Sequence, residues 1–159
     1  TPTAGQILVR VEGAGLNRAD LSAARAVPPR PLGMEWSGEV VALGAGVRQF
    51  ALGERVMCSG AGGYAGYAVA EAGRSISLAG LNLTPEIAAT LPLALMTAHD
   101  AVISKGALTA GQSVLVQGAS TAVGQMALRC LMLILMVQTM QKALILLILS
   151  ANQKRLTVI

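Results

Sequence analysis

The chain has 159 residues, of which 53% are hydrophobic and 3% aromatic, and its formal net charge is +4. This length suits one ordinary domain with a sizeable core, and the scarcity of aromatic residues gives no support to nucleic-acid binding. Two cysteines, Cys58 and Cys130, exclude a disulfide framework and favour a reducing compartment, so we expect a cytoplasmic protein without nucleic-acid partners.

The first half of the chain consists of short apolar runs separated by glycines. The runs typical of strands are residues 7–11, 38–44, 55–58, 67–70 and 75–78. Short strands at this spacing predict a twisted antiparallel sheet or a small barrel. The proline-rich stretch at 26–33 predicts an extended loop, because proline restricts its own backbone and that of the preceding residue.

From Thr84 onward the pattern becomes helical. Thr84 is the predicted N-cap of a helix and Pro85 its first residue. We expect this helix to break near Pro92 and to resume over residues 94–104.

The last third of the chain predicts the start of a nucleotide-binding α/β unit. Its elements are a strand at 113–117 buried on both faces, a glycine-containing turn at 118–124, a helix from about 123 to 142 and a second buried strand at 143–149.

The turn at 118–124 has the small residues that a dinucleotide-binding turn requires. Ala119, Thr121 and Gly124 occupy the places for the tight turn, for the approach of the pyrophosphate to the backbone and for close packing of helix on strand. With Ser120 and Val123, they would bind the pyrophosphate at the start of the helix, where free N–H groups favour anions. Two of the three places are not glycine, and an ordinary turn between strand and helix would look almost the same.

Five sequence motifs follow one another in the first 128 residues. They are AGLNRADL at 14–21, LGMEWSGEVVALGAGV at 32–47, FALGERVM at 50–57, GGYAGY at 62–67 and LPLALMTAHDA at 91–101. In content and order they resemble the zinc-free quinone oxidoreductases of the medium-chain dehydrogenase/reductase superfamily. The resemblance implies an α+β fold, with a GroES-like, β-rich catalytic domain over 1–90 followed by a hinge helix and the beginning of a Rossmann domain over 91–159.

The resemblance also implies which residues form the active site. It places Asn17 beside the nicotinamide, Tyr64 in a loop near the cleft, and Thr97 facing the cofactor. Each has an ordinary alternative, since Asn17 can cap a turn, Tyr64 can pack on the β-rich domain and Thr97 can be a plain helical threonine.

No zinc site is expected. Zinc-dependent relatives have a cysteine where this chain has Asn17 and a histidine where it has Met34, and neither replacement is a good zinc ligand. Glu35 is retained, but one carboxylate does not make a site, and Cys58 stands without the four-cysteine lobe of those relatives. The single histidine, His99, could bind a metal, but a helix-packing or surface role is favoured.

The resemblance implies a hydride transfer from NADPH to a small-molecule quinone or enone. No residue after Asp100 is acidic, so no carboxylate there can accept a hydrogen bond from a free ribose 2′-hydroxyl. Ser150, Lys154 and Arg155 could instead hold the 2′-phosphate of NADPH, although their spacing from Gly124 is larger than the family pattern.

The resemblance ends near residue 130, where LMLILMVQTMQK at 131–142 replaces the expected glycine turn. We therefore expect a truncated enzyme, without its first strands and most of its cofactor domain, that is inactive alone and self-associates through open apolar edges. The alternative is a non-catalytic fragment that serves as a binding or interaction module. A membrane anchor over 126–151 is disfavoured, because Arg129 and Lys142 interrupt the apolar run.

Overall fold

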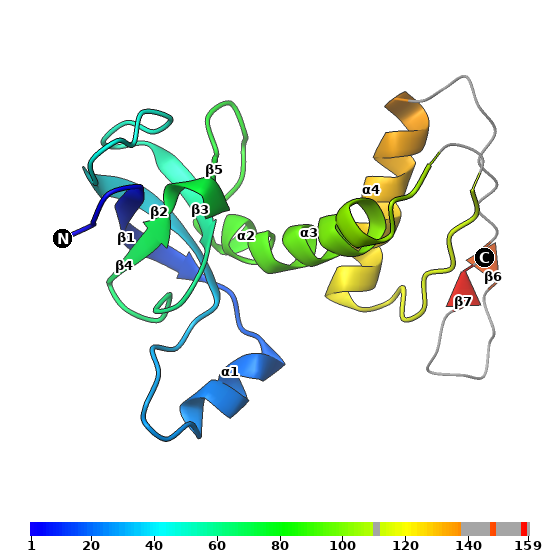
Figure 1. The fold of residues 1–159 in the computed structure, drawn as a ribbon, viewed down its shortest axis with the longest axis horizontal. Helices are drawn as coiled ribbons and strands as arrows, with labels where there is room; N and C mark the ends of the chain where they lie inside the picture. The colour runs from blue at the N-terminus through cyan, green and yellow to red at the C-terminus, as the bar shows by residue number, and fades with distance from the viewer. Residues whose placement is uncertain (110–111, 138–146, 149–156, 159) are drawn as a thin grey trace. The chain divides into compact units, whose positions relative to one another are not determined.

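The computed structural model describes residues 1–109, 112–137, 147–148 and 157–158. They divide into two units, Thr1–Leu93 and Ala94–Ile159, whose elements Figure 1 shows in chain order. The domain boundary predicted from the sequence, after residue 90, lies between one helix that ends at Ala89 and another that begins at Pro92.

The first unit is centred on a five-stranded antiparallel sheet (Figure 1). Its strands are β1 (Gln6–Ala14), β2 (Glu35–Leu43), β3 (Arg55–Ser59), β4 (Tyr67–Glu71) and β5 (Ser75–Ser77). In space the order is β4–β1–β2–β3–β5, and every neighbouring pair is antiparallel. The five strands predicted from the sequence and their antiparallel arrangement are confirmed, although β2 begins at Glu35 rather than at residue 38.

The core of this unit lies on one face of the sheet. Along the first half of β1, buried Ile7 and Val9 alternate with more exposed residues, as in a half-buried strand. They pack with Trp36, Val40 and Val56, all of which are fully buried. The core therefore combines aliphatic side chains with the single tryptophan of the chain.

The pairing of β1 with β2 is irregular at two points, between Leu8 and Val9 and between Val11 and Gly13. Such bulges increase the twist of a strand pair. Between them, a Cβ on Gly38 of β2 would lie 2.0 Å from the carbonyl oxygen of Arg10. Only glycine allows the two strands to approach this closely.

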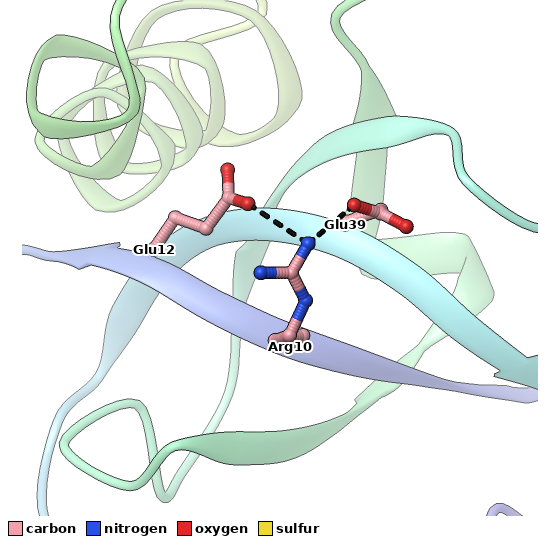
Figure 2. Close-up of polar contacts among 3 residues, drawn as sticks. All are labelled: Arg10, Glu12 and Glu39. Atoms are coloured by element: carbon pink, nitrogen blue, oxygen red, sulfur yellow. Dashed lines mark hydrogen bonds and ion pairs between the residues drawn. The ribbon is translucent and has the colours of Figure 1, made fainter.

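The exposed side of the same two strands has a small ion cluster (Figure 2). Arg10 of β1 lies opposite Glu39 of β2 in the register, and its guanidinium contacts the carboxylate of Glu39 and, at 3.3 Å, that of Glu12. Because these side chains are well exposed, water screens their charges and the pairs add little to stability. The cluster is a solvated surface feature rather than a candidate site.

Two short helices, α1 (Arg18–Ala24) and α2 (Pro85–Ala89), and a 3₁₀ turn, η1 (Ala72–Arg74), complete the unit. The predicted start of α2 is confirmed, because the Thr84 side chain accepts a hydrogen bond from the Ile87 N–H and Pro85 is the first helical residue. The Ser37 hydroxyl of β2 donates to the Pro85 carbonyl oxygen at 2.6 Å and ties α2 to the sheet.

Helix α1 was not predicted. Its only buried residue is Asp20, while Leu21 is 62% exposed, so the helix shows no apolar stripe from which it could be identified.

Helix α3 (Pro92–His99) begins with the last two residues of the first unit and continues into the second. The second unit also contains a π-helical turn η2 (Asp100–Lys105), α4 (Ala122–Val137) and a pair of two-residue strands, β6 (Leu147–Ile148) and β7 (Thr157–Val158). The helix break predicted near Pro92 is confirmed. Helix α4 begins one residue before the predicted start, and residues 138–142 lie outside the described part of the chain. The core of this unit is formed by Ala98, Val102, Val116, Ala119, Ala127 and Leu131.

The predicted strand at 113–117 is wrong. The segment forms no strand, and Val116 is its only buried residue. A strand requires a neighbour for its N–H and C=O groups, and the neighbour expected at 143–149 is described only at Leu147–Ile148. Those two residues pair antiparallel with β7 instead, so the described residues form no parallel strand–helix–strand unit.

One helical stretch among the described residues, Pro85–Lys105, has the length and composition to cross a membrane, and 33% of it is buried. This is weak support for a membrane span, because core helices of soluble proteins have the same properties. The span disfavoured from the sequence, 126–151, extends beyond the described residues.

Candidate active site

Asn17 connects the end of β1 to the start of α1. Its backbone is extended, and its N–H donates to Asp20 Oδ2 at 2.8 Å, while the Asp20 N–H donates to the Asn17 carbonyl oxygen at 3.0 Å. The Asp20 carboxylate thus satisfies the N-cap N–H, as the residue three positions after the cap does in a capping box, and the backbone bond closes the first turn of the helix. These two bonds fix the backbone of Asn17, so its side chain leaves the helix start in a defined direction.

Glu35, the first residue of β2, receives that side chain. Asn17 Nδ2 donates to Glu35 Oε1 at 3.0 Å, and the Leu93 N–H donates to Glu35 Oε2 at 2.9 Å. Glu35 is only 4% exposed, and no Lys or Arg lies within ion-pair distance of it among the described residues. Leu93 is the last residue of the first unit, so both hydrogen bonds to this carboxylate lie within that unit.

Asp20 is the second buried carboxylate, at 7% exposure. Its Oδ2 accepts from the Tyr64 hydroxyl at 2.6 Å as well as from the Asn17 N–H, and its Oδ1 accepts from the Gly33 N–H at 3.3 Å. The Tyr64 hydroxyl also lies 3.3 Å from the Gly15 carbonyl oxygen. One carboxylate thus joins the start of α1 to the loops before β2 and after β3.

The two loops also contact each other directly. The Tyr64 N–H donates to the Leu32 carbonyl oxygen and the Gly63 N–H to that of Gly33, each at 3.1 Å. Gly33 has φ +90°, and a Cβ there would lie 2.6 Å from the Tyr64 nitrogen. Position 33 therefore requires glycine for its backbone conformation and for this close approach.

The Tyr64 hydroxyl is a poor proton donor in this setting. Partial burial of the hydroxyl, followed by the hydrogen bond to the Asp20 carboxylate and the charge of that group, raises the pKa of Tyr64 to about 12. The residue as a whole is 40% exposed. At neutral pH the phenol is protonated, and its hydrogen is directed at Asp20.

The structure brings two of the three predicted site residues together. Asn17 and Tyr64 meet at Asp20, whereas Thr97 lies exposed on α3 in the second unit. Asp20 was not predicted from the sequence as a functional residue, and Glu35 was given no role. The spacing of Asn17 and Asp20, an N-cap residue with an acidic residue three positions later, was the signal that could have identified Asp20.

The predicted nucleotide-binding turn precedes α4. Gly118 has φ +71°, and the Thr121 side chain accepts from the Gly124 N–H at 3.1 Å, so Thr121 caps the helix. A Cβ on Gly124 would lie 2.3 Å from the Gly118 carbonyl oxygen, so glycine is needed for the turn to pack on the helix. Ala119 is buried, whereas Ser120, Thr121 and Val123 are exposed.

A hollow of about 730 Å³ adjoins this turn and includes Thr121, Val123 and Gly124 in its lining. Exposed residues at the N-terminus of a 16-residue helix form a surface that an anion can approach. The other predicted cofactor residues, Ser150, Lys154 and Arg155, lie outside the described residues.

The residues at the zinc position of metal-dependent relatives do not fit a zinc ion. Both oxygens of Glu35 already accept hydrogen bonds, and the amide nitrogen of Asn17 is one of the donors. Met34 offers a thioether, which zinc does not favour. Burial raises the pKa of the Cys58 thiol to about 11, so it is not a thiolate at neutral pH. Among the described residues, no three His, Cys, Asp or Glu side chains gather as a metal site.

The curled antiparallel sheet and the site at its edge define a GroES-like domain. Residues 3–80 match the alcohol dehydrogenase GroES-like domain.

The chain is also similar to individual proteins and solved structures. It is 38% identical over 127 residues to the polyketide synthase GfsB of Streptomyces halstedii, covering 79% of this chain and 2% of that protein. A crystal structure of an alcohol dehydrogenase superfamily protein from Novosphingobium aromaticivorans matches at 33% identity with TM-score 0.72, covering 84% of this chain and 44% of the other. A mycobacterial quinone oxidoreductase matches at 30% identity with TM-score 0.67, covering 80% and 41%. A mycobacterial structure complexed with NADPH matches with the same figures.

The chain belongs to the medium-chain dehydrogenase/reductase superfamily of oxidoreductases, and its relatives include quinone oxidoreductases. It spans less than half the length of each of the proteins described above.

Proposed function

We propose that the chain forms the substrate side and the first part of the cofactor site of a zinc-independent, NADPH-dependent oxidoreductase that reduces a conjugated carbonyl compound, a quinone or an enone. The observation on which this rests most is the hydrogen bond from Asn17 to Glu35, at the position where metal-dependent relatives have a zinc ligand.

Asn17 supplies a hydrogen-bond donor in place of a metal. An ionised carboxylate only accepts hydrogen bonds, so Glu35 orients the Asn17 amide with Nδ2 toward itself. The amide nitrogen has two hydrogens, and one of them is used by Glu35. The second is available to a substrate carbonyl oxygen, whose developing negative charge during reduction it would stabilise.

Tyr64 has a different role. Because its hydroxyl hydrogen is directed at Asp20 and its pKa is raised to about 12, it does not serve as the proton donor at neutral pH. Its partly exposed side chain is proposed to line the site that Asn17 faces. Thr97 is proposed to face the cofactor, as the resemblance implies.

The turn before α4 is the proposed pyrophosphate site. Gly124 packs the turn on the helix, Ala119 is buried beneath it, and the backbone at Ser120, Thr121 and Val123 is exposed at the helix start. When NADPH is bound there, its nicotinamide supplies the hydride. Ser150, Lys154 and Arg155 are proposed to hold the 2′-phosphate.

The relatives support this choice of cofactor and substrate. One is named a quinone oxidoreductase, and another was solved with NADPH. An α,β-unsaturated carbonyl compound is tested beside a quinone because both present a conjugated carbonyl group to the proposed donor at Asn17. A cytoplasmic location and a small-molecule partner belong to the same proposal.

The test is a titration of the purified chain with NADPH, followed by nicotinamide fluorescence. Thr121→Asp places a negative charge at the pyrophosphate site while keeping a residue type that caps helices well, so binding should be lost without loss of α4. Thr109→Asp, at an exposed position outside the turn, is the control and should bind like the wild type. Absence of NADPH binding by the wild type would instead favour a non-catalytic binding module.

A further inference from the structure

Asp20 is a buried carboxylate whose charge is balanced by neutral donors alone. The Asn17 N–H, the Gly33 N–H and the Tyr64 hydroxyl all donate to it, and no Lys or Arg lies within ion-pair distance of it in the described part of the chain. A buried carboxylate is costly unless it is hydrogen-bonded. The three donors stabilise the buried carboxylate, and the carboxylate in turn fixes the positions of the three donors.

Two of these donors share one oxygen atom. Asp20 Oδ2 lies 2.8 Å from the Asn17 nitrogen and 2.6 Å from the Tyr64 hydroxyl oxygen. The helix start that presents the Asn17 amide and the loop that presents the Tyr64 ring are thus joined through a single atom. Neither can move against the other without breaking a charge-assisted hydrogen bond, which is about twice as strong as a neutral one.

We propose that Asp20 is a positioning residue that fixes Asn17 and Tyr64 relative to each other. The inference rests on the proposed function, because it takes these two residues to face the substrate. Asp20 itself is buried and acts only through its two partners.

This arrangement also divides the roles at the site. Tyr64 has one hydroxyl hydrogen, and Asp20 accepts it, so Tyr64 does not donate to a substrate carbonyl while the contact is intact. The Asn17 side-chain amide is then the donor that a carbonyl oxygen meets. Asp20 holds the backbone N–H of Asn17, and Glu35 orients the side-chain amide itself. We expect the site to select ligands that accept, rather than donate, a hydrogen bond.

The chain has two tyrosines, Tyr64 and Tyr67, so a Tyr67→Phe variant reports on Tyr64 alone. Its tyrosinate absorbance near 295 nm should rise with a midpoint near pH 12, while the emission of Trp36 shows in the same samples that the unit is folded. Adding Asp20→Asn should move the midpoint down toward the ordinary tyrosine value of about 10. Burial of the hydroxyl and the charge of Glu35 also raise this pKa and remain in the variant. The midpoint should therefore fall only part of the way to the ordinary value.

A double-mutant cycle provides the second readout. The effects of Asp20→Asn and Tyr64→Phe on the unfolding equilibrium constant should be non-additive by about tenfold, as expected for a hydrogen bond to a charged group. The matched pair Asp20→Asn and Tyr67→Phe should be additive, since Tyr67 lies on β4 opposite Arg10. If Asp20→Asn does not fold, an ordinary midpoint for Tyr64 in the Tyr67→Phe variant would still overturn the contact, because both burial and Asp20 raise this pKa.

An ordinary midpoint for Tyr64 in the Tyr67→Phe variant, or additive effects in both cycles, would overturn the inference. Neither readout involves NADPH. A failure of cofactor binding would therefore refute the proposed function and leave the Asp20 contacts standing, and the reverse result would refute only the role of Asp20.

Discussion

The contacts of Glu35 make a quantitative prediction about the stability of the first unit. In Glu35→Gln the side chain keeps its size, but only one of its two terminal atoms can still accept a hydrogen bond. The amide NH₂ must then face either the Leu93 N–H, which is only a donor, or the Asn17 side chain, whose amide would have to turn over so that its Oδ1 accepts. Either the Leu93 N–H loses its partner, or the Asn17 Nδ2 donor is turned away from its present position.

The expected cost follows from the burial of this position. Leaving a buried donor unsatisfied costs about 1–3 kcal/mol. The loss of the negative charge acts in two opposite ways, because the remaining bond becomes weaker while a neutral amide is cheaper to bury than a carboxylate. With Glu35 only 4% exposed, we expect Glu35→Gln to lower the free energy of unfolding by about 1–3 kcal/mol.

The assay is urea unfolding followed by the emission of Trp36, which is the only tryptophan, neighbours Glu35 in β2 and is fully buried. Glu39→Gln is the matched control: it makes the same chemical change on the same strand, in the exposed ion cluster with Arg10 (Figure 2). Its cost should stay below about 1 kcal/mol. Equal losses in the two variants, or a change at Glu35 within about 0.5 kcal/mol of wild type, would refute the reasoning.

Three further outcomes are expected. Gly124→Ala should abolish NADPH binding, because its Cβ would lie 2.3 Å from the Gly118 carbonyl oxygen, whereas Gly73→Ala, with nothing within 4 Å, should bind normally. The protonated Tyr64 hydroxyl should make the free energy of unfolding of the wild type larger than that of Tyr64→Phe, with the full difference present below about pH 10. This difference should fall as the pH rises through about 12, which urea unfolding at several pH values would show. A difference independent of pH would contradict the raised pKa of Tyr64. Elemental analysis should find no stoichiometric zinc; one tightly held zinc per chain would disprove the proposed metal-free site.

The fold of the first unit was largely predictable from the sequence. The short apolar runs and glycines were sufficient for all five strands, and Thr84 with Pro85 marked the start of α2. Helix α1 was missed because it is stabilised by polar contacts at Asp20 rather than by an apolar face. In the second unit, the apolar run at 113–117 was taken for a buried strand, but such a strand depends on neighbouring strands that the described residues do not contain.

The candidate site was only partly predictable. Asn17 and Tyr64 were selected from motifs, and the structure shows that they meet, but the atom that joins them belongs to Asp20. Tyr64 lies 44 positions from Asp20, and no local pattern encodes a hydrogen bond between residues so far apart in sequence. Glu35 was set aside as a lone carboxylate because its partner at Leu93 is a backbone N–H, which residue identities do not reveal.

The central claim, that the chain binds NADPH at the turn before α4, is tested most directly by parallel fluorescence titrations with NADPH and NADH. No acidic residue follows Asp100, while Lys154 and Arg155 provide positive charge, so we expect NADPH to bind more tightly. Equal or tighter binding of NADH, or no binding of either nucleotide by folded chain, would contradict the account.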